Sequence, residues 1–261
     1  MTTPLEEALE RLVNRVPEVT LVFWILKILA TTVGETAGDL LSITFKLGTV
    51  VTSYVMGALL LITLGIQFRA RRYVPWIYWL VVVFISVVGT LISDNLVDNL
   101  GVPLTTTTAI FMVALILVFV FWYMSEKTLS VHTIFTHRRE AFYWAAILFT
   151  FSLGTSGGDL LSERMAVGYA LSAVIFAAGI AIIYGLYRMR VIGEVLAFWL
   201  AYILTRPLGA SMGDLLTQAP ADGGLGLGTI PVSAVFLLII VILVVHLTRE
   251  EKKLALANPL P

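Results

Sequence analysis

The sequence predicts an all-α integral membrane protein of about eight transmembrane helices, arranged as four parallel two-helix repeats with pseudo-symmetry about the membrane normal. Three observations predict this fold class. The 261-residue chain is 59% hydrophobic and only 13% charged, which is not the composition of a soluble domain of this length. Eight apolar runs are each long enough to cross a bilayer. One signature recurs four times at matching places in these runs.

The eight apolar runs are joined by short polar connections, so each run is expected to form one helix. They lie near 20–43, 46–68, 75–98, 104–124, 142–162, 166–187, 195–217 and 229–248. The first 19 residues mix acidic and basic side chains and contain no apolar stretch, so the first helix itself, and not a cleavable signal, is expected to direct insertion. Residues 20–248 should therefore form one transmembrane domain between an N-terminal segment, 1–19, and a tail, 249–261.

The repeated signature consists of a Trp, nine residues, a Gly, three residues, a Gly or Ser, and then an Asp. Its four copies are Trp24/Gly34/Gly38/Asp39, Trp79/Gly89/Ser93/Asp94, Trp144/Gly154/Gly158/Asp159 and Trp199/Gly209/Gly213/Asp214. Each copy lies on the first helix of a repeat, and the repeats span about 20–72, 75–127, 140–190 and 195–248. Because every repeat contains two spans, all four enter the membrane from the same side and are parallel, not inverted.

Lys and Arg are concentrated on one side of this topology. That side holds 13 of the 17, namely Arg11, Arg15, Arg69, Arg71, Arg72, Lys127, Arg138, Arg139, Arg188, Arg190, Arg249, Lys252 and Lys253. An excess of positive charge is typical of the cytoplasmic side, so both termini are expected to face the cytoplasm and the tryptophans to lie near that interface. Each Asp follows its Trp by 15 residues, or about 22 Å along a helix. The four acids are therefore expected at similar depth in the outer half of the membrane.

Small residues four apart on one helix face let membrane helices approach closely. The signature supplies such a helix-packing pair in every repeat: Gly34/Gly38, Gly89/Ser93, Gly154/Gly158 and Gly209/Gly213. Packing alone would explain these small residues, because such pairs are common in membrane spans. Packing does not require the carboxylate that follows each pair.

The principal candidates for function are the four signature acids, Asp39, Asp94, Asp159 and Asp214. A charged side chain inside a membrane costs at least about 2.5 kcal/mol, and four such costs at one repeated position suggest a use. Glu35 lies one turn before Asp39, and Asp98 lies one turn after Asp94. Thr155 occupies in the third repeat the position that Glu35 occupies in the first. We predict that these residues surround a shared cavity and bind a cation or protons, with the four Asp and Glu35 as metal ligands.

Two basic residues lie within the predicted spans. Lys27 lies near the cytoplasmic end of the first span, where its side chain is expected to extend to the interface. Arg206 lies immediately before Pro207, where the helix is expected to kink. As the ion partner of one acid, Arg206 would either lower the negative charge of the site or exchange partners during a transport cycle.

The residue types near the acids restrict the ion. The chain has no Cys, and His132, His137 and His246 lie outside the cores of the repeats. Carboxylate, hydroxyl and carbonyl oxygens suit hard ions such as Mn²⁺, Mg²⁺, Ca²⁺, Na⁺ or protons. The sequence thus predicts no cofactor beyond a bound divalent or monovalent cation. The expected partners are the lipid bilayer, the cation and protons, with no nucleic acid, and the oligomeric state stays open.

The strings GETAGDLLS, GTSGGDLLSE and GASMGDLLTQ, each preceded by an aromatic residue and Trp, resemble bacterial membrane proteins built from four copies of a short repeat of unknown function. The resemblance covers about residues 20 to 248. The second copy departs most, with ISDNLVDNL where the others have Gly before Asp. The resemblance implies an eight-helix fold and little chemistry. A bacterial protein of this topology is expected in the cytoplasmic (inner) membrane.

Three functional hypotheses from different classes follow. The first is a secondary transporter or exporter of a small hard cation, which it exchanges for protons at the acids. The second is a proton-coupled carrier of a small organic solute, and the third is a non-transport enzyme, structural protein or sensor. An enzyme is not expected, because the residue three before each signature Asp is never the Gly of the Gly-x-Gly-Asp string found in intramembrane aspartyl proteases. The longest loop, about 125–141, is short and lacks a phosphate-binding Gly string, so a gradient would supply the energy.

Overall fold

The computed structural model describes the backbone of residues 14–257 and side chains as far as residue 253. The expected N-terminal segment, 1–19, and the tail, 249–261, therefore lie partly outside the described residues. Arg11 lies outside them altogether. Within the described part there are eight long helices and no strand. The helices are α2 (Leu21–Asp39), α3 (Thr49–Arg69), α4 (Pro75–Asp94), α5 (Leu104–Glu126), α6 (His137–Asp159), α7 (Tyr169–Arg188), α8 (Glu194–Thr217) and α9 (Thr229–Ala257).

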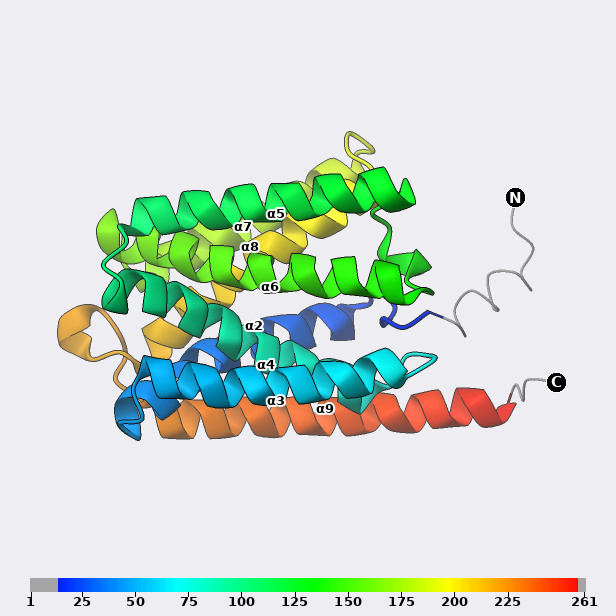
Figure 1. Cartoon of the computed structure of the whole chain (residues 1–261). Coiled ribbons are helices and arrows are strands. Elements are labelled where there is room, and N and C mark those ends of the chain that lie inside the picture. Colours follow the sequence, from blue (N-terminus) through cyan, green and yellow to red (C-terminus); the bar gives the residue numbers. More distant parts are fainter. Residues whose placement is uncertain (1–13, 258–261) are drawn as a thin grey trace.

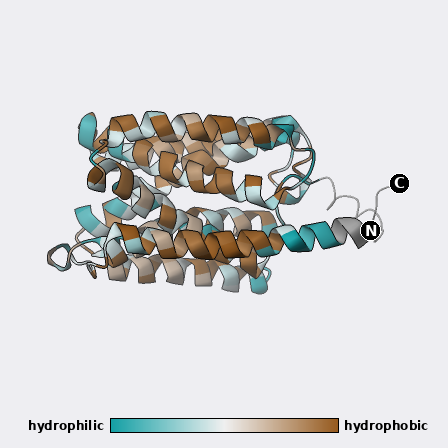
Figure 2. Cartoon of the chain, turned by 90° about the horizontal axis from the view of Figure 1, so that it is seen from below, coloured by the Kyte–Doolittle hydropathy of each residue, from teal (hydrophilic) through white to brown (hydrophobic). Residues whose placement is uncertain are grey.

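Seven of the described helices are long and apolar enough to cross a membrane, which indicates a multi-pass membrane protein. The eighth, α6, is also long, but it begins with a charged turn and contains many Ser, Thr and Gly residues, which lower its hydropathy. Figure 2 shows apolar residues along the length of the helices and hydrophilic residues gathered toward the two ends of the bundle.

The helices lie side by side in one bundle (Figure 1). Helices α2, α4, α6 and α8 begin at the end that holds the four signature tryptophans, here named the tryptophan end. They finish at the opposite end, named the aspartate end. The start of α2 and the close of α9 both lie toward the tryptophan end, on the right of Figure 1.

The first helices of the four repeats form the centre of the bundle. Helix α2 packs on α4, α4 on α6, α6 on α8, and α8 on α2, so these inner helices close a ring. Of the apolar windows of α2, α4 and α8, 61–72% is buried, whereas only 11–22% is buried in the outer helices α3, α5, α7 and α9. The inner helices therefore carry the interior of the molecule, and the outer helices expose apolar side chains suited to lipid.

The outer helices interlock the repeats. Each packs mainly on the inner helix of the following repeat, not on its own: α3 on α4, α5 on α6, and α7 on α8. Helix α9 completes the cycle by packing on α2 of the first repeat. The parallel repeats predicted from the sequence thus form a cyclic arrangement in which every repeat covers its neighbour.

Three helix starts differ from the predicted ones by three residues or more. Helix α6 begins five residues early, because the side chain of Thr136 caps it by accepting a backbone hydrogen bond. Helices α3 and α7 begin three residues late. In both preceding turns a non-glycine residue, Lys46 or Ala166, has a φ near 55°, and a glycine, Gly48 or Gly168, follows with positive φ. These two left-handed positions end one helix and redirect the chain into the next.

A π-helical turn directly follows the signature Asp in three repeats: η1 (Leu40–Thr44), η2 (Asn95–Asn99) and η4 (Leu160–Arg164). In the fourth repeat α8 instead continues to Thr217. Turns of this type are rare and are frequently found at functional sites. They place a wider turn beside three of the four signature acids.

A buried ion pair ties the chain before α2 to the tryptophan end. Arg15 Nη1 donates to Glu140 Oε2 at 2.5 Å, and Gln67 Nε2 donates to Glu140 Oε1 at 2.9 Å. Glu140 is fully buried. The carboxylate therefore joins the residues before α2 to α3 and α6, a role that was not predicted from the sequence.

Candidate functional site

The inner helices place repeat-equivalent residues in successive layers along the bundle. Residues four apart lie on nearly the same face of a helix, so counting in fours from the residue before each Trp follows the inward face. The layers are Phe23/Tyr78/Tyr143/Phe198, Lys27/Val82/Ile147/Tyr202, Thr31/Ser86/Phe151/Arg206, Glu35/Thr90/Thr155/Ala210 and Asp39/Asp94/Asp159/Asp214. Every member of the first four layers is buried. We call the last of the five the carboxylate layer.

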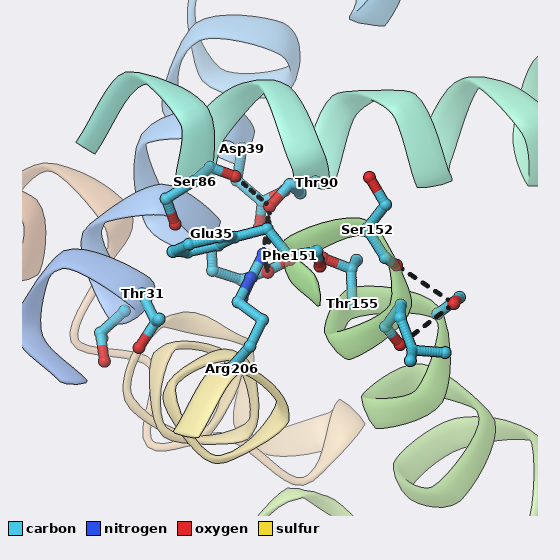
Figure 3. Close-up of polar contacts among 12 residues, drawn as sticks. Thr31, Glu35, Asp39, Ser86, Thr90, Phe151, Ser152, Thr155 and Arg206 are labelled. Atoms are coloured by element: carbon cyan, nitrogen blue, oxygen red, sulfur yellow. Dashed lines mark hydrogen bonds and ion pairs between the residues drawn. The ribbon is translucent and has the colours of Figure 1, made fainter. Parts of the chain in front are cut away.

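Arg206 connects all four inner helices. Its Nη2 donates to Glu35 Oε2 at 2.9 Å, to Thr155 Oγ1 at 2.7 Å and to Thr90 Oγ1 (Figure 3). These three acceptors come from α2, α6 and α4 and occupy the same position of the repeat. Arg206 is fully buried, and we name it and its three partners the arginine node.

Arg206 thus pairs with Glu35 and not with a signature Asp. Helix α8 continues through Pro207 to Thr217. The proline therefore does not end the helix that positions the guanidinium.

The carboxylate layer lies one helical turn from the arginine node, toward the aspartate end. Asp214 is buried, and the other three acids are partly exposed. Asp39 accepts a long hydrogen bond from Gln218 Nε2, at 3.4 Å. Among the described residues, the side chains of Asp94, Asp159 and Asp214 have no hydrogen bond or ion pair. Three of these four carboxylates therefore lack a direct partner within the described part of the chain.

The acids nevertheless lie within electrostatic range of one another. Asp159 interacts with Glu35, Asp94 and Asp214. Asp94 and Asp214 also interact with Arg206. The site is therefore a connected group of charges from all four repeats.

The predicted metal ligands are not gathered into one cluster. Within the described residues, no three Asp, Glu or His side chains lie close enough together to hold a metal ion. The four signature acids occupy one layer, and Glu35 lies a turn away, bound to Arg206. Asp98 is exposed in η2, beyond the carboxylate layer.

The prediction for Lys27 is wrong. Its side chain does not extend to the interface but is fully buried between two rings, with Nζ 3.9 Å from the centroid of Phe151 and 4.2 Å from that of Tyr202. Nζ has no hydrogen-bond partner within the described part of the chain. The faces of the two aromatic rings attract the ammonium group, and both rings come from helices distant in sequence.

An aromatic layer closes the tryptophan end of the interior. The hydroxyl groups of Tyr78 and Tyr143 lie 2.5 Å apart in a hydrogen bond, and the rings of Phe23 and Phe198 are 6.0 Å apart. No role for this layer was predicted from the sequence. The signal was present, because an aromatic residue immediately precedes the Trp in every copy of the signature.

The glycines of the signature lie where neighbouring inner helices touch. The contacts of the first Gly run around the ring, from Gly34 to Ser86, Gly89 to Phe151, Gly154 to Arg206 and Gly209 to Thr31. A Cβ at any of these four glycines would overlap the side chain opposite. The second position is looser, with 3.3–3.6 Å from such a Cβ to its nearest neighbour at Gly38, Gly158 and Gly213. Ser93 occupies this position in the second repeat and is buried.

The fold and site together define a class of helical bundle in which four interlocked repeats enclose a charged interior. One family model matches four times, at residues 22–73, 77–128, 142–191 and 197–253, and is described as Repeat of Unknown Function (DUF347). Each match contains one signature and one pair of helices. Since the matches cover most of the chain, the protein belongs to this repeat family. No curated protein and no solved structure matches it.

Proposed function

We propose that the protein is a secondary transporter of a small hard cation, which it exchanges for protons through the carboxylate layer. The candidate ions are Mn²⁺, Mg²⁺, Ca²⁺ and Na⁺, because the layer offers oxygen ligands and no Cys or His. The proposal places the protein in the cytoplasmic membrane of a bacterium, with both termini in the cytoplasm.

The carboxylate layer is the observation that carries this proposal. Four acids, one from each repeat, lie in an apolar bundle, and three of them lack a direct partner among the described residues. With Glu35 they amount to five acidic groups, whereas the five layers of the inner helices hold two basic ones, Lys27 and Arg206. Unpaired charge is costly inside a membrane protein, so bound cations or protons would stabilise the layer.

The different closure of the two ends supports transport over a purely structural role. At the aspartate end the carboxylate layer is partly exposed. Toward the tryptophan end the buried arginine node, Lys27 and the aromatic layer follow in succession. A binding layer that is partly exposed toward one end and covered toward the other is compatible with one state of an alternating-access cycle.

The charges at the two ends support the orientation. The tryptophan end carries most of the Lys and Arg residues of the loops, and these favour the cytoplasmic side. The carboxylate layer would then open away from the cytoplasm.

Transport by purified protein in liposomes tests the proposal. Gradients of Mn²⁺, Mg²⁺, Ca²⁺ and Na⁺ would be imposed in turn, while indicators inside the vesicles report ion entry and pH. We expect one of these cations to move, with protons moving in the opposite direction. Proton-coupled uptake of an organic solute without cation movement would contradict the proposal.

Asp159→Asn is the first variant to compare with the wild type. It should lower the transport rate by at least about ten-fold, because a charged hydrogen-bonding ligand contributes about 1.5–3 kcal/mol to binding. Asp222→Asn is the matched control, since Asp222 is an exposed acid in the loop at the same end. Equal rates for Asp159→Asn and the wild type would remove the carboxylate from the mechanism.

A further inference from the structure

Three oxygen atoms from three different helices converge on a single nitrogen of the arginine node. Glu35 Oε2 and Thr155 Oγ1 lie 2.9 and 2.7 Å from Arg206 Nη2, and Thr90 Oγ1 contacts the same atom. Thr90 Oγ1 also lies 3.4 Å from Glu35 Oε2. The three oxygens therefore surround one point at the centre of the inner ring (Figure 3).

Each of the two hydroxyl groups can donate its single proton to a carbonyl of its own helix, away from this point. Thr90 Oγ1 lies 3.2 Å from the carbonyl of Ser86, and Thr155 Oγ1 lies 3.3 Å from the carbonyl of Phe151. A hydroxyl group has one proton and two lone pairs, so when it donates to its own helix it presents lone pairs to the centre. Two hydroxyl oxygens and one carboxylate then form a purely accepting set with one negative charge, which suits a hard cation.

We infer that Glu35, Thr90 and Thr155 form an inner binding site for a singly charged hard cation, and that Arg206 occupies this site as a tethered competitor. The inference rests on the proposed transport function, which it deepens by naming a second site and the charge of its ligand. Exchange of the guanidinium for a monovalent ion such as Na⁺ leaves the charge beside Glu35 unchanged. A divalent ion would leave one additional positive charge in a buried layer.

The neighbouring carboxylate layer supplies both the entrance and a place for the displaced arginine. Each carboxylate lies four residues, or about 6 Å along its helix, from the corresponding position of the node. Asp94 and Asp214 already lie within electrostatic range of Arg206. A cation that enters through this layer can therefore replace the guanidinium at Glu35 while the guanidinium moves toward these two acids.

Arg206→Met tests the competition directly, because methionine fills space but brings no charge and no donor. If the site is free of Arg206 for about 1% of the time, the apparent Na⁺ affinity of the wild type is about 100-fold lower than that of the permanently free site. We expect the variant to bind ²²Na⁺ at least about ten-fold more tightly than the wild type in detergent at constant ionic strength. Unchanged Na⁺ affinity, or tightening for Mg²⁺ and not for Na⁺, would overturn the inference.

Two control variants distinguish occupation of the inner site by Arg206 from the effect of a nearby positive charge. Lys27→Met removes the other buried positive charge, but Lys27 acts on the node only through its field, so its effect on Na⁺ affinity should be far smaller. The double variant Glu35→Gln/Arg206→Met removes the carboxylate and should lose the gained affinity. Equal tightening in Lys27→Met and Arg206→Met would show that Arg206 does not act as an occupant.

A measurement on the wild type covers the case in which Arg206→Met fails to fold. With ¹⁵N-labelled arginine, the Arg206 side-chain resonance, assigned by its loss in Arg206→Lys, should shift on addition of Na⁺ but not of a bulky organic cation. A resonance insensitive to Na⁺ would contradict the inference. If the wild type transports no cation but the resonance shifts, the inner site stands and the transport proposal fails. If the wild type transports a cation but the resonance does not move, the transport proposal stands and the inner site fails.

Discussion

Glu140→Ala is expected to lower the free energy of unfolding by about 3–5 kcal/mol, the usual cost of removing one partner from a buried ion pair. The variant leaves the guanidinium of Arg15 without its carboxylate, and the Arg15 side chain is only 9% exposed. It also removes the acceptor of Gln67. The chain before α2 should consequently detach from α3 and α6 more readily than in the wild type.

Unfolding in detergent, followed by tryptophan fluorescence, measures this effect. Glu194→Ala is the matched control, because Glu194 pairs with His132 at 3.1 Å but has a 65% exposed side chain. Exposed pairs contribute about 1 kcal/mol at most, so the control should unfold almost like the wild type. The double variant Arg15→Ala/Glu140→Ala should recover part of the loss. Equal effects of Glu140→Ala and Glu194→Ala would contradict a structural role for the buried pair.

Gly154→Ala should destabilise the protein by about 3 kcal/mol, at the upper end of the usual cost of overpacking. Its new Cβ would overlap the Cβ and Cγ of Arg206 and lie 3.1 Å from Cδ of Pro207. Atoms so close to the backbone of α8 cannot move without displacing the helix. Because Arg206 is also displaced, the arginine node should be disturbed by the same substitution.

Gly157→Ala provides the control for this prediction within the same helix. A Cβ at Gly157 has no neighbour within 4 Å, and alanine is a better helix former than glycine by up to about 1 kcal/mol. The control should therefore be as stable as the wild type or more stable, when the two are compared by thermal unfolding in the same detergent. Equal melting temperatures for the two variants would show that α6 and α8 are not in close contact at Gly154.

The fold class could be predicted because its signals are local in the sequence. Hydropathy over about 20 residues indicates a membrane-spanning length wherever the helix packs, and the spacing from Trp24 to Asp39 recurs without gaps. The repeat-equivalent positions of the acids follow from the same count. The predicted start of α6 was less accurate, because its first turn is polar and only the cap at Thr136 marks it.

The candidate site could be predicted only in its composition. The recurrence of the signature identified the four acids, Glu35 and Thr155, and Arg206 was recognised as an ion partner. The sequence of a single helix did not predict that Arg206 pairs with Glu35 and not with an aspartate. It also did not predict that Lys27 is buried against Phe151. Each depends on which side chains other helices bring to the same layer.

The sequence by itself determined the all-helical class, the four parallel repeats and the common position of the four acids, because length, hydropathy and spacing are properties of single segments. Only the tertiary structure decided that α9 packs on α2 to complete the cycle of interlocked repeats, and that Arg206 contacts the other three inner helices at one repeat position. The physical reason is that packing and ion pairing join residues far apart in the chain. Glu35 and Arg206 are separated by 171 positions, and only the closed ring of inner helices brings them within 2.9 Å.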